Sequence, residues 1–211
     1  MTQTLPTPAQ AWNRLLEGNQ RFAAGESGQA RTDQARRLHL REKQNPIAVV
    51  LACSDSRVPV ELVFDAGLGD VFVVRTAGEI LDEAVMGSVS FGVNSLNVPL
   101  VIVLGHQGCG AVGATVSALD GGTIPNDHQR ALVEKVATSV LAARQEGKTS
   151  TFEYERRHAA ETASQLIQRM PKLASKVAEG SVAVVAARYI LESGEVEFVA
   201  SHGPRLDTPE K

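Results

Sequence analysis

The chain has 211 residues and a mass of 22.5 kDa, which fits one domain with a substantial core. Hydrophobic residues make up 43% and charged residues 21%, so collagen-like, coiled-coil and largely disordered classes are excluded. The formal net charge of −3 gives no positive field for nucleic acid or an anionic membrane, so neither is expected as a partner. No uncharged apolar stretch approaches the roughly 18 residues of a membrane span.

The chain contains two cysteines, Cys53 and Cys109. Two cysteines cannot build the framework of several disulfides that small secreted domains use. The first twelve residues lack the basic segment followed by an apolar one that marks a secretory signal. We therefore expect a cytoplasmic protein with reduced thiols, in which a cysteine pair is more often metal-binding or catalytic than structural.

The first quarter of the chain is predicted to be an N-terminal arm. Apolar residues recur at helical spacing over 8–24, which predicts an amphipathic helix that ends at Gly25. A second helix is predicted over 35–44, because Pro46 then stops it.

Three continuous apolar runs of strand length begin at Ile47, Val71 and Val98. Their lack of alternation is typical of strands buried on both faces of a parallel sheet. Between the second and third runs, residues 81–96 have the apolar spacing of a helix face. The order strand, helix, strand predicts a right-handed parallel crossover.

The second half of the chain is predicted to add helices and to close the sheet. A short helix is predicted after Gly110, and the charged periodic segments 126–145 and 151–176 are predicted as surface helices, the second broken or kinked at Pro171. Two β-rich runs around Ser193–Gly194 predict one further strand and a final antiparallel strand. The predicted fold class is α/β, with a central, mostly parallel sheet, flanking helices, an N-terminal helical arm and an antiparallel edge strand at the C-terminus.

Both cysteines stand where an apolar strand gives way to a polar turn, and the carboxyl ends of parallel strands form the binding crevice of an open sheet. A lone cysteine there is more often a small buried hydrophobe. Together, however, Cys53, His106 and Cys109 supply two thiolates and one imidazole, a set suited to zinc. A closed structural zinc site normally has four protein ligands, so three ligands and an open position indicate a catalytic site.

Asp55 and Arg57 follow the first cysteine closely. If the chain stays extended past Cys53, the side chains of residues 53, 55 and 57 point to one side. Arg57 could then hold the Asp55 carboxylate in a bidentate grip, and Asp55 could accept a hydrogen bond from a metal-bound water or bind the metal itself. The alternative is a surface ion pair that only caps the turn.

The segments CSDSRV at 53–58 and GHQGCGAV at 105–112, with VVRTAG between them, resemble the β-class carbonic anhydrases, and the resemblance covers most of the chain. It implies reversible hydration of CO2 to bicarbonate and a proton by attack of zinc-bound hydroxide. It also implies one domain over 1–211, assembled as a homodimer or homotetramer. The helical arm, 1–45, would pack on the partner subunit, and 46–211 would form the catalytic α/β core.

The same resemblance assigns roles to individual residues. It implies one Zn²⁺ per chain, bound by Cys53, His106 and Cys109, and it makes Asp55 and Arg57 the catalytic pair.

For the substrate pocket, the resemblance implies Gln44, Phe72, Phe91 and Gly110. Phe91 stands where family members carry a tyrosine, so the apolar wall is kept and a hydroxyl is lost. Members regulated by bicarbonate at a second site carry a tryptophan three residues before the first cysteine, where this chain has Val50. The open-site bacterial subtype is therefore expected.

Two other functions stay open at this point: hydrolysis of CS2 or COS on the same scaffold, and a thiol redox or metal-sensing role for the two cysteines. Redox proteins commonly carry a C-x-x-C pair, which is absent from the sequence. A nucleotide-binding function is excluded, since no G-x-G-x-x-G or Walker A segment follows a strand. His128 and His158 are interpreted as solvated surface residues, so neither is assigned as a proton shuttle.

Overall fold

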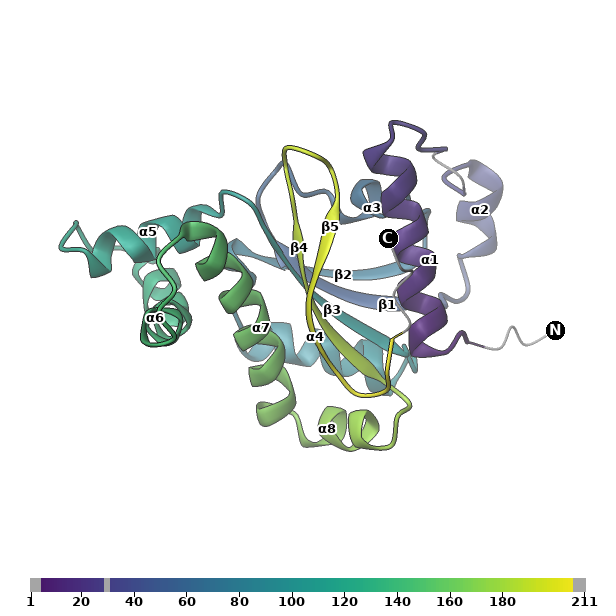
Figure 1. Cartoon of the computed structure of the whole chain (residues 1–211). Helices are drawn as coiled ribbons and strands as arrows, with labels where there is room; N and C mark the ends of the chain where they lie inside the picture. Colours follow the sequence, from purple (N-terminus) through teal and green to yellow (C-terminus); the bar gives the residue numbers. More distant parts are fainter. Residues whose placement is uncertain (1–4, 29–30, 207–211) are drawn as a thin grey trace.

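A five-stranded sheet in the order β2-β1-β3-β4-β5 forms the centre of the molecule (Figure 1). The structure is a computed structural model that describes residues 5–28 and 31–206. The strands are β1 (Ala48–Cys53), β2 (Val71–Thr76), β3 (Leu100–His106), β4 (Ala183–Tyr189) and β5 (Val196–His202). Strands β1 to β4 are parallel, and β5 runs antiparallel to β4, so the predicted sheet is confirmed.

Helices surround the sheet on both faces and at one end (Figure 1). They are α1 (Pro8–Ala23), α2 (Gln34–His39), α3 (Val60–Val63), the 3₁₀ turn η1 (Ala77–Glu79), α4 (Glu83–Asn94), α5 (Gly110–Leu119), α6 (Arg130–Gln145), α7 (Thr151–Arg169) and α8 (Pro171–Ala178). Within the described ranges, no helix is both long enough and apolar enough to span a membrane.

Strand β1 is buried along its whole length because helices cover both faces of the sheet. Ala48, Val50 and Ala52 pack toward α1 and α3. Val49 and Leu51 pack toward α4, α7 and α8. A strand that is buried on both faces needs apolar residues at every position, which explains the uninterrupted apolar run.

The helix of the predicted arm packs on the sheet of its own chain. Trp12 of α1 is fully buried in the core. The Asn19 side chain, which is also buried, donates to the carbonyls of Val63 (3.0 Å) and Gly194 (2.8 Å) and accepts from the Val196 amide (2.7 Å). Helix α1 is thereby attached to α3 and to the β4–β5 hairpin, and its packing on a partner subunit stays a prediction.

Two helices are shorter than the sequence predicts. Helix α2 ends at His39 instead of continuing to 44, because it buries no residue that would stabilise further turns. Helix α6 begins at Arg130 rather than near 126, since the Asp127 carboxylate accepts from the Gln129 amide at 2.9 Å and forms a turn there.

The predicted break near Pro171 is confirmed. Met170 separates α7 from α8 with φ −123° and ψ 85°, outside the helical region. The residue before a proline is pushed out of the helical conformation by the proline ring, so one periodic segment becomes two helices.

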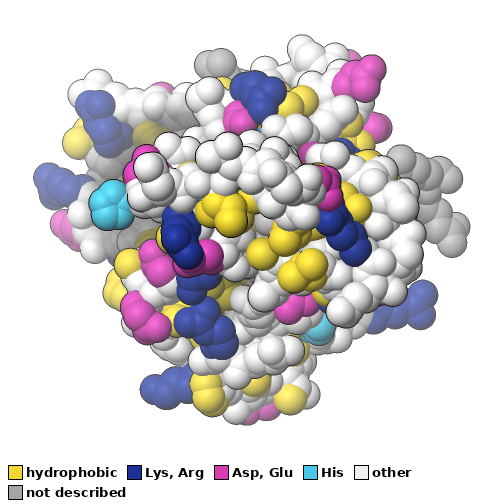
Figure 2. Space-filling model, turned by 90° about the vertical axis from the view of Figure 1, so that its left-hand side faces the viewer, with side chains coloured by type: hydrophobic (Ala, Val, Ile, Leu, Met, Phe, Trp, Pro, Cys, Tyr) yellow, Lys and Arg dark blue, Asp and Glu magenta, His cyan; other side chains and the backbone are white. Residues whose placement is uncertain are grey.

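The strand order reverses at β1, because β2 lies on one side of it and β3 on the other. Such a reversal opens a crevice at the carboxyl ends of the two strands. Cys53 is the last residue of β1 and His106 the last of β3. Helices α5 and α6 extend beyond this end of the sheet (Figure 1), and Figure 2 shows that end of the molecule, where apolar side chains gather between charged ones.

Candidate metal centre

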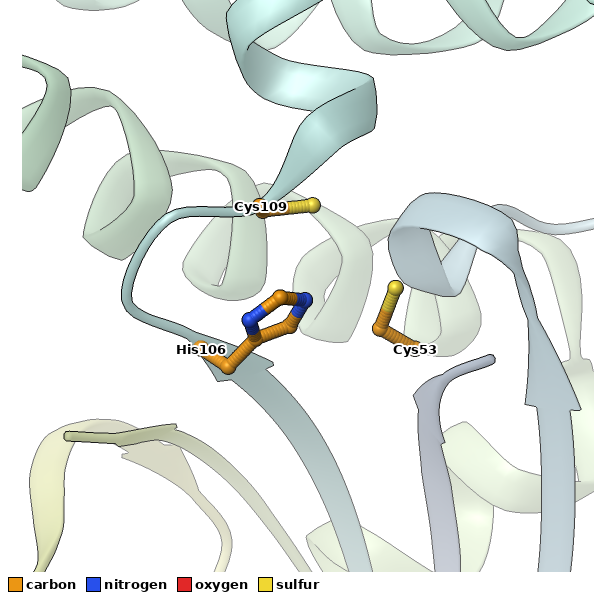
Figure 3. A group of neighbouring side chains, drawn as sticks. All are labelled: Cys53, His106 and Cys109. Atoms are coloured by element: carbon orange, nitrogen blue, oxygen red, sulfur yellow. The ribbon is translucent and has the colours of Figure 1, made fainter. Parts of the chain in front are cut away.

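Cys53, His106 and Cys109 converge at the carboxyl end of the sheet (Figure 3). Cys53 ends β1, His106 ends β3, and Cys109 is the N-cap residue just before α5. Their ligand atoms all lie within 4.8 Å of one another, and all three residues are buried. The fold therefore brings together three residues that the sequence places on two distant segments.

The imidazole of His106 is oriented for metal binding. Its Nδ1–H donates to the backbone carbonyl of Gln107 at 2.9 Å. Among the described residues, its buried Nε2 has no hydrogen-bond partner. A buried polar atom without a partner is costly, and a metal ion between Nε2 and the two sulfur atoms would satisfy it. The donor set thus fits zinc in chemistry and in position.

The backbone supports the sulfur of Cys53. The amide of Gly78 donates to the Cys53 Sγ at 3.2 Å, and Gly78 has a left-handed φ of +70°, which glycine adopts without strain. The neighbouring Cys109 thiol lowers the pKa of Cys53, and the neighbouring Cys53 sulfur, followed by burial, raises the pKa of Cys109. A thiolate is the form that binds a metal, and the site stabilises it at Cys53.

Asp55 and Arg57 form the predicted pair, but through a turn instead of an extended chain. The amide of Val58 donates to the Asp55 carbonyl at 3.0 Å, and the amide of Arg57 donates to Asp55 Oδ1 at 2.9 Å. The expectation of an extended chain is therefore wrong, because the aspartate side chain closes a local turn. The guanidinium still grips both carboxylate oxygens, Nε to Oδ1 at 2.9 Å and Nη2 to Oδ2 at 2.8 Å.

The Asp55 carboxylate lies beside the metal centre. Its Oδ2 is 3.9 Å from His106 Nε2. Hydrogen bonds from Arg57 hold the pKa of Asp55 well below its usual range. The carboxylate is thus ionised, oriented and close to the group that would bind the metal.

Arg75 in β2 was not singled out in the sequence as a site residue. Its Nε and Nη2 donate to the Cys53 carbonyl at 3.0 Å, and its Nη2 also donates to the Asp55 carbonyl at 2.6 Å. It therefore fixes the backbone that carries a ligand and the acidic residue. The sequence feature that could have indicated Arg75 is its place at the end of an apolar run, in the VVRTAG segment.

Two buried titratable groups lie behind Cys53. The His158 ring donates through Nε2–H to the Gly78 carbonyl at 2.7 Å and accepts at Nδ1 from the Ser139 hydroxyl at 2.9 Å. The interpretation of His158 as a solvated surface residue is wrong, since it is 2% exposed and burial lowers its pKa. Glu79 is 1% exposed, and burial, followed by the charge of Cys53, raises its pKa.

A cavity of about 440 Å³ opens beside the cluster. Cys53, Asp55 and Gly110 line it, so Gly110 lies where the pocket is predicted. Helix α6 and the segment before it contribute further lining residues that the sequence did not indicate, namely Pro125, Gln129, Leu132 and Val133. The packing of α6 on α5 brings these residues to the cavity, and this packing cannot be inferred from the local sequence.

The other predicted pocket residues lie away from this cavity within the chain. Gln44 is exposed in the segment before β1. Phe72 pairs with Val49 near the beginning of the strands, whereas the metal residues stand at the strand ends. Phe91 is 48% exposed and packs on Phe72 with ring centroids 6.0 Å apart. One chain therefore does not bring these three residues to the metal centre.

Comparison with known proteins agrees with this geometry. A family model described as carbonic anhydrase matches residues 48–196. Carbonic anhydrase 2 of Mycobacterium tuberculosis is 46% identical over 187 residues, which cover 89% of this chain and 90% of that protein. The carbonic anhydrase of Mycolicibacterium smegmatis is 47% identical over 191 residues, covering 90% and 93%.

Solved structures share the fold at lower sequence identity. Tetrameric β-carbonic anhydrases of Sordaria macrospora superpose with a TM-score of 0.72 at 19% identity, covering 92% of this chain and 100% of the matched chain. A Coccomyxa β-carbonic anhydrase in complex with acetazolamide gives 0.70 at 21% identity, covering 88% and 84%.

Proposed function

The chain belongs to the β-class carbonic anhydrase family, and we propose that it catalyses the zinc-dependent, reversible hydration of CO2 to bicarbonate and a proton. One observation carries this proposal. The thiolate and imidazole atoms of Cys53, His106 and Cys109 converge, with the carboxylate of Asp55 3.9 Å from His106 Nε2.

The two sulfur atoms and the His106 Nε2 would hold the zinc ion. When bound, zinc acidifies water and so supplies a nucleophile near neutral pH. Two thiolates neutralise the charge of the ion more than neutral imidazoles do, so water is acidified less than at a three-histidine centre. The surrounding residues must therefore contribute to orientation and proton transfer.

The residues of the chain have separate tasks in this reaction. Arg57 keeps Asp55 ionised and aimed at the centre, and Asp55 Oδ2 accepts a hydrogen bond from the reacting water. The apolar side chains of Leu132 and Val133 give the cavity a wall suited to CO2, which is linear and uncharged. Asp55 forms the polar side of the cavity, where negative charge develops as CO2 becomes bicarbonate.

We further propose the open-site subtype, in which the fourth metal position is left to solvent. The bidentate grip of Arg57 supports it, because the same guanidinium that orients Asp55 also holds it away from the ligand set. Val50, at the position of the tryptophan of the regulated subtype, is fully buried in the sheet core.

We also propose a homodimer or homotetramer in the cytoplasm. The free thiols of Cys53 and Cys109 suit a reducing compartment. The Sordaria macrospora enzymes that share the fold are tetramers. An assembly would explain how Gln44, Phe72 and Phe91 reach a metal centre, namely that of a neighbouring subunit, and the arm over 1–45 would pack on that subunit.

Metal analysis beside a stopped-flow CO2 hydration assay tests the function. We expect about one zinc per chain and hydration that rises with pH from neutral to mildly alkaline values, because the nucleophile is the deprotonated form. Active protein without zinc, or a flat pH profile, would contradict the proposal. CS2 and COS are assayed in parallel, and faster turnover of either would show that the scaffold serves hydrolysis of these molecules instead.

A further inference from the structure

A buried ion pair lies directly behind the turn that carries Cys109. Glu155 of α7 is 2% exposed and Arg188 of β4 is 3% exposed. The Glu155 Oε2 accepts from Arg188 Nε at 2.8 Å and lies 2.8 Å from its Nη2. The other oxygen, Oε1, accepts from the amides of Gly108 (2.7 Å) and Cys109 (3.3 Å). One carboxylate thus joins the arginine to the backbone of a metal ligand.

A buried ion pair is weak evidence for a contribution to stability. Moving two charges out of water costs several kcal/mol, and apolar residues of similar volume in place of a buried pair are often equally or more stabilising. The two pocket-facing groups already described, Asp55 and Arg57, are not part of it. The contact with the Gly108 and Cys109 amides suggests a role that an apolar pair would not fill.

Arg188 is itself held in place from three sides. In the sheet it stands opposite Gly105, next to the end of β3 where His106 lies. Its guanidinium stacks 4.5 Å from the Phe152 ring centroid, and its Nη1 is 3.7 Å from Glu197 Oε2. An arginine fixed in this way gives Glu155 a rigid partner.

The turn that Glu155 binds lies between two residues of the candidate metal centre, His106 and Cys109. Gly108 adopts a left-handed φ of +70°. Its two neighbours in the chain are Gln107, which orients the His106 ring, and Cys109. The carboxylate accepts two consecutive amides of this turn and so sets the direction in which the Cys109 side chain leaves the backbone.

We propose that Glu155 and Arg188 are positioning residues that hold the Cys109 turn in the conformation required for zinc binding. This inference rests on the proposed zinc-dependent function and deepens it. Partners of metal ligands in the next layer typically change metal affinity about 10- to 100-fold when they are removed.

The test compares zinc affinity with folding stability in purified full-length protein. Zinc affinity is measured by competition with a chelator, and stability by urea denaturation of the zinc-free and zinc-loaded forms. Arg188→Met alone leaves the Glu155 charge buried and unpaired, so its loss of stability is not diagnostic. The double variant Glu155→Met with Arg188→Met removes both charges, and we expect it to lose less zinc-free stability than Arg188→Met, because only the Gly108 and Cys109 amides lose an acceptor.

In this double variant, zinc affinity should fall by more than the loss of zinc-free folding stability explains. We expect a zinc affinity about 10- to 100-fold weaker and an altered thiolate-to-cobalt absorption band in the cobalt-substituted protein. Glu155→Gln combined with Arg188→Met keeps an oxygen acceptor for the Gly108 and Cys109 amides without a buried charge. It should recover most of the lost affinity.

A control removes another ion pair of α7, by Arg157→Met with Glu161→Met, whose partly buried charged atoms are 2.6 Å apart; Arg157 also pairs with Glu146. Its zinc affinity should not change. The inference is overturned if the Glu155→Met, Arg188→Met protein binds zinc as tightly as the unaltered protein, or if the glutamine variant gives no recovery. If the unaltered protein binds no zinc, the proposed function is overturned. If it binds zinc and the double variant binds zinc equally tightly, only the positioning role is overturned.

Discussion

Asp55 lies between two groups that can bind its carboxylate. Arg57 holds both oxygens at 2.8–2.9 Å, and Oδ2 is 3.9 Å from the Nε2 of His106. A carboxylate is also a good zinc ligand. We therefore expect the guanidinium to decide whether the fourth metal position stays open for water.

Arg57→Ala should close that position. Without the grip of the guanidinium, Asp55 can turn the short distance onto the metal, and we expect hydration activity to fall about 100-fold or more. The cobalt-substituted variant should lose its exchangeable water, as measured by water-proton relaxation. An exchangeable water that persists in the variant would contradict this expectation. The control is Arg57→Lys, which keeps one charged donor and should retain part of the open form.

His158 is buried in its neutral form, and this makes stability depend on pH. Burial lowers its pKa in the folded protein, and the Glu79 carboxyl lies 4.0 Å from its Nε2. As pH falls through about 6.5, the unfolded chain takes up a proton that the folded chain does not. Folding stability should therefore fall with decreasing pH below that value.

His158→Gln keeps a donor for the Gly78 carbonyl and cannot titrate. Between pH 6.5 and 5.5, unaltered protein should lose up to roughly 1.4 kcal/mol more folding free energy than the variant. Urea denaturation at several pH values measures both curves, and their difference cancels effects common to both, including loss of zinc. His128→Gln, at an exposed position, should leave the slope unchanged. Parallel curves for the unaltered protein and His158→Gln would show that His158 ionises in the folded state.

Helices and strands could be predicted from the sequence where their physical cause lies in neighbouring residues. The strands from Ala48, Val71 and Leu100 were predicted because burial on both faces demands continuous apolar runs, and such runs are visible in the sequence. The convergence of Cys53, His106 and Cys109 could be predicted because parallel strands end at one edge of the sheet. In contrast, nothing local indicates that Leu132 lines the cavity or that Glu155 holds the metal turn.

Asn19 attaches the N-terminal helix to the rest of the chain, and Asn19→Ala tests this attachment. The change leaves two backbone carbonyls and the Val196 amide without their buried partner. We expect a loss of about 2–4 kcal/mol in the free energy of unfolding, measured by urea denaturation. Gln20→Ala, at an exposed position of the same helix, should change it by less than about 0.5 kcal/mol. A loss below about 0.5 kcal/mol for Asn19→Ala would show that these hydrogen bonds do not attach the helix.

At the scale of the whole molecule, one edge of the sheet is more open than its core. Strand β2 is an edge strand, and its apolar residues are only partly buried, in contrast to the fully buried β1. Phe72 of this strand and Phe91 of α4 stack at that edge, away from the metal centre of their own chain. A second copy placed there would cover the rings and let them contact its site, which makes this edge the expected subunit contact.

Phe91→Glu should therefore weaken assembly. Covering an aromatic ring contributes about 1.5–3 kcal/mol, and a buried carboxylate adds a further cost, so the dissociation constant between subunits should rise at least about tenfold. Sedimentation velocity over a range of protein concentrations measures it, together with hydration activity per chain, which should fall as the assembly separates. Leu141→Glu is the matched control, because Leu141 is 46% exposed, close to the 48% of Phe91, and belongs to α6, which extends beyond the end of the sheet (Figure 1). Unchanged sedimentation of the Phe91 variant would place the subunit contact on another surface, and Phe91 would then have no route to a metal centre.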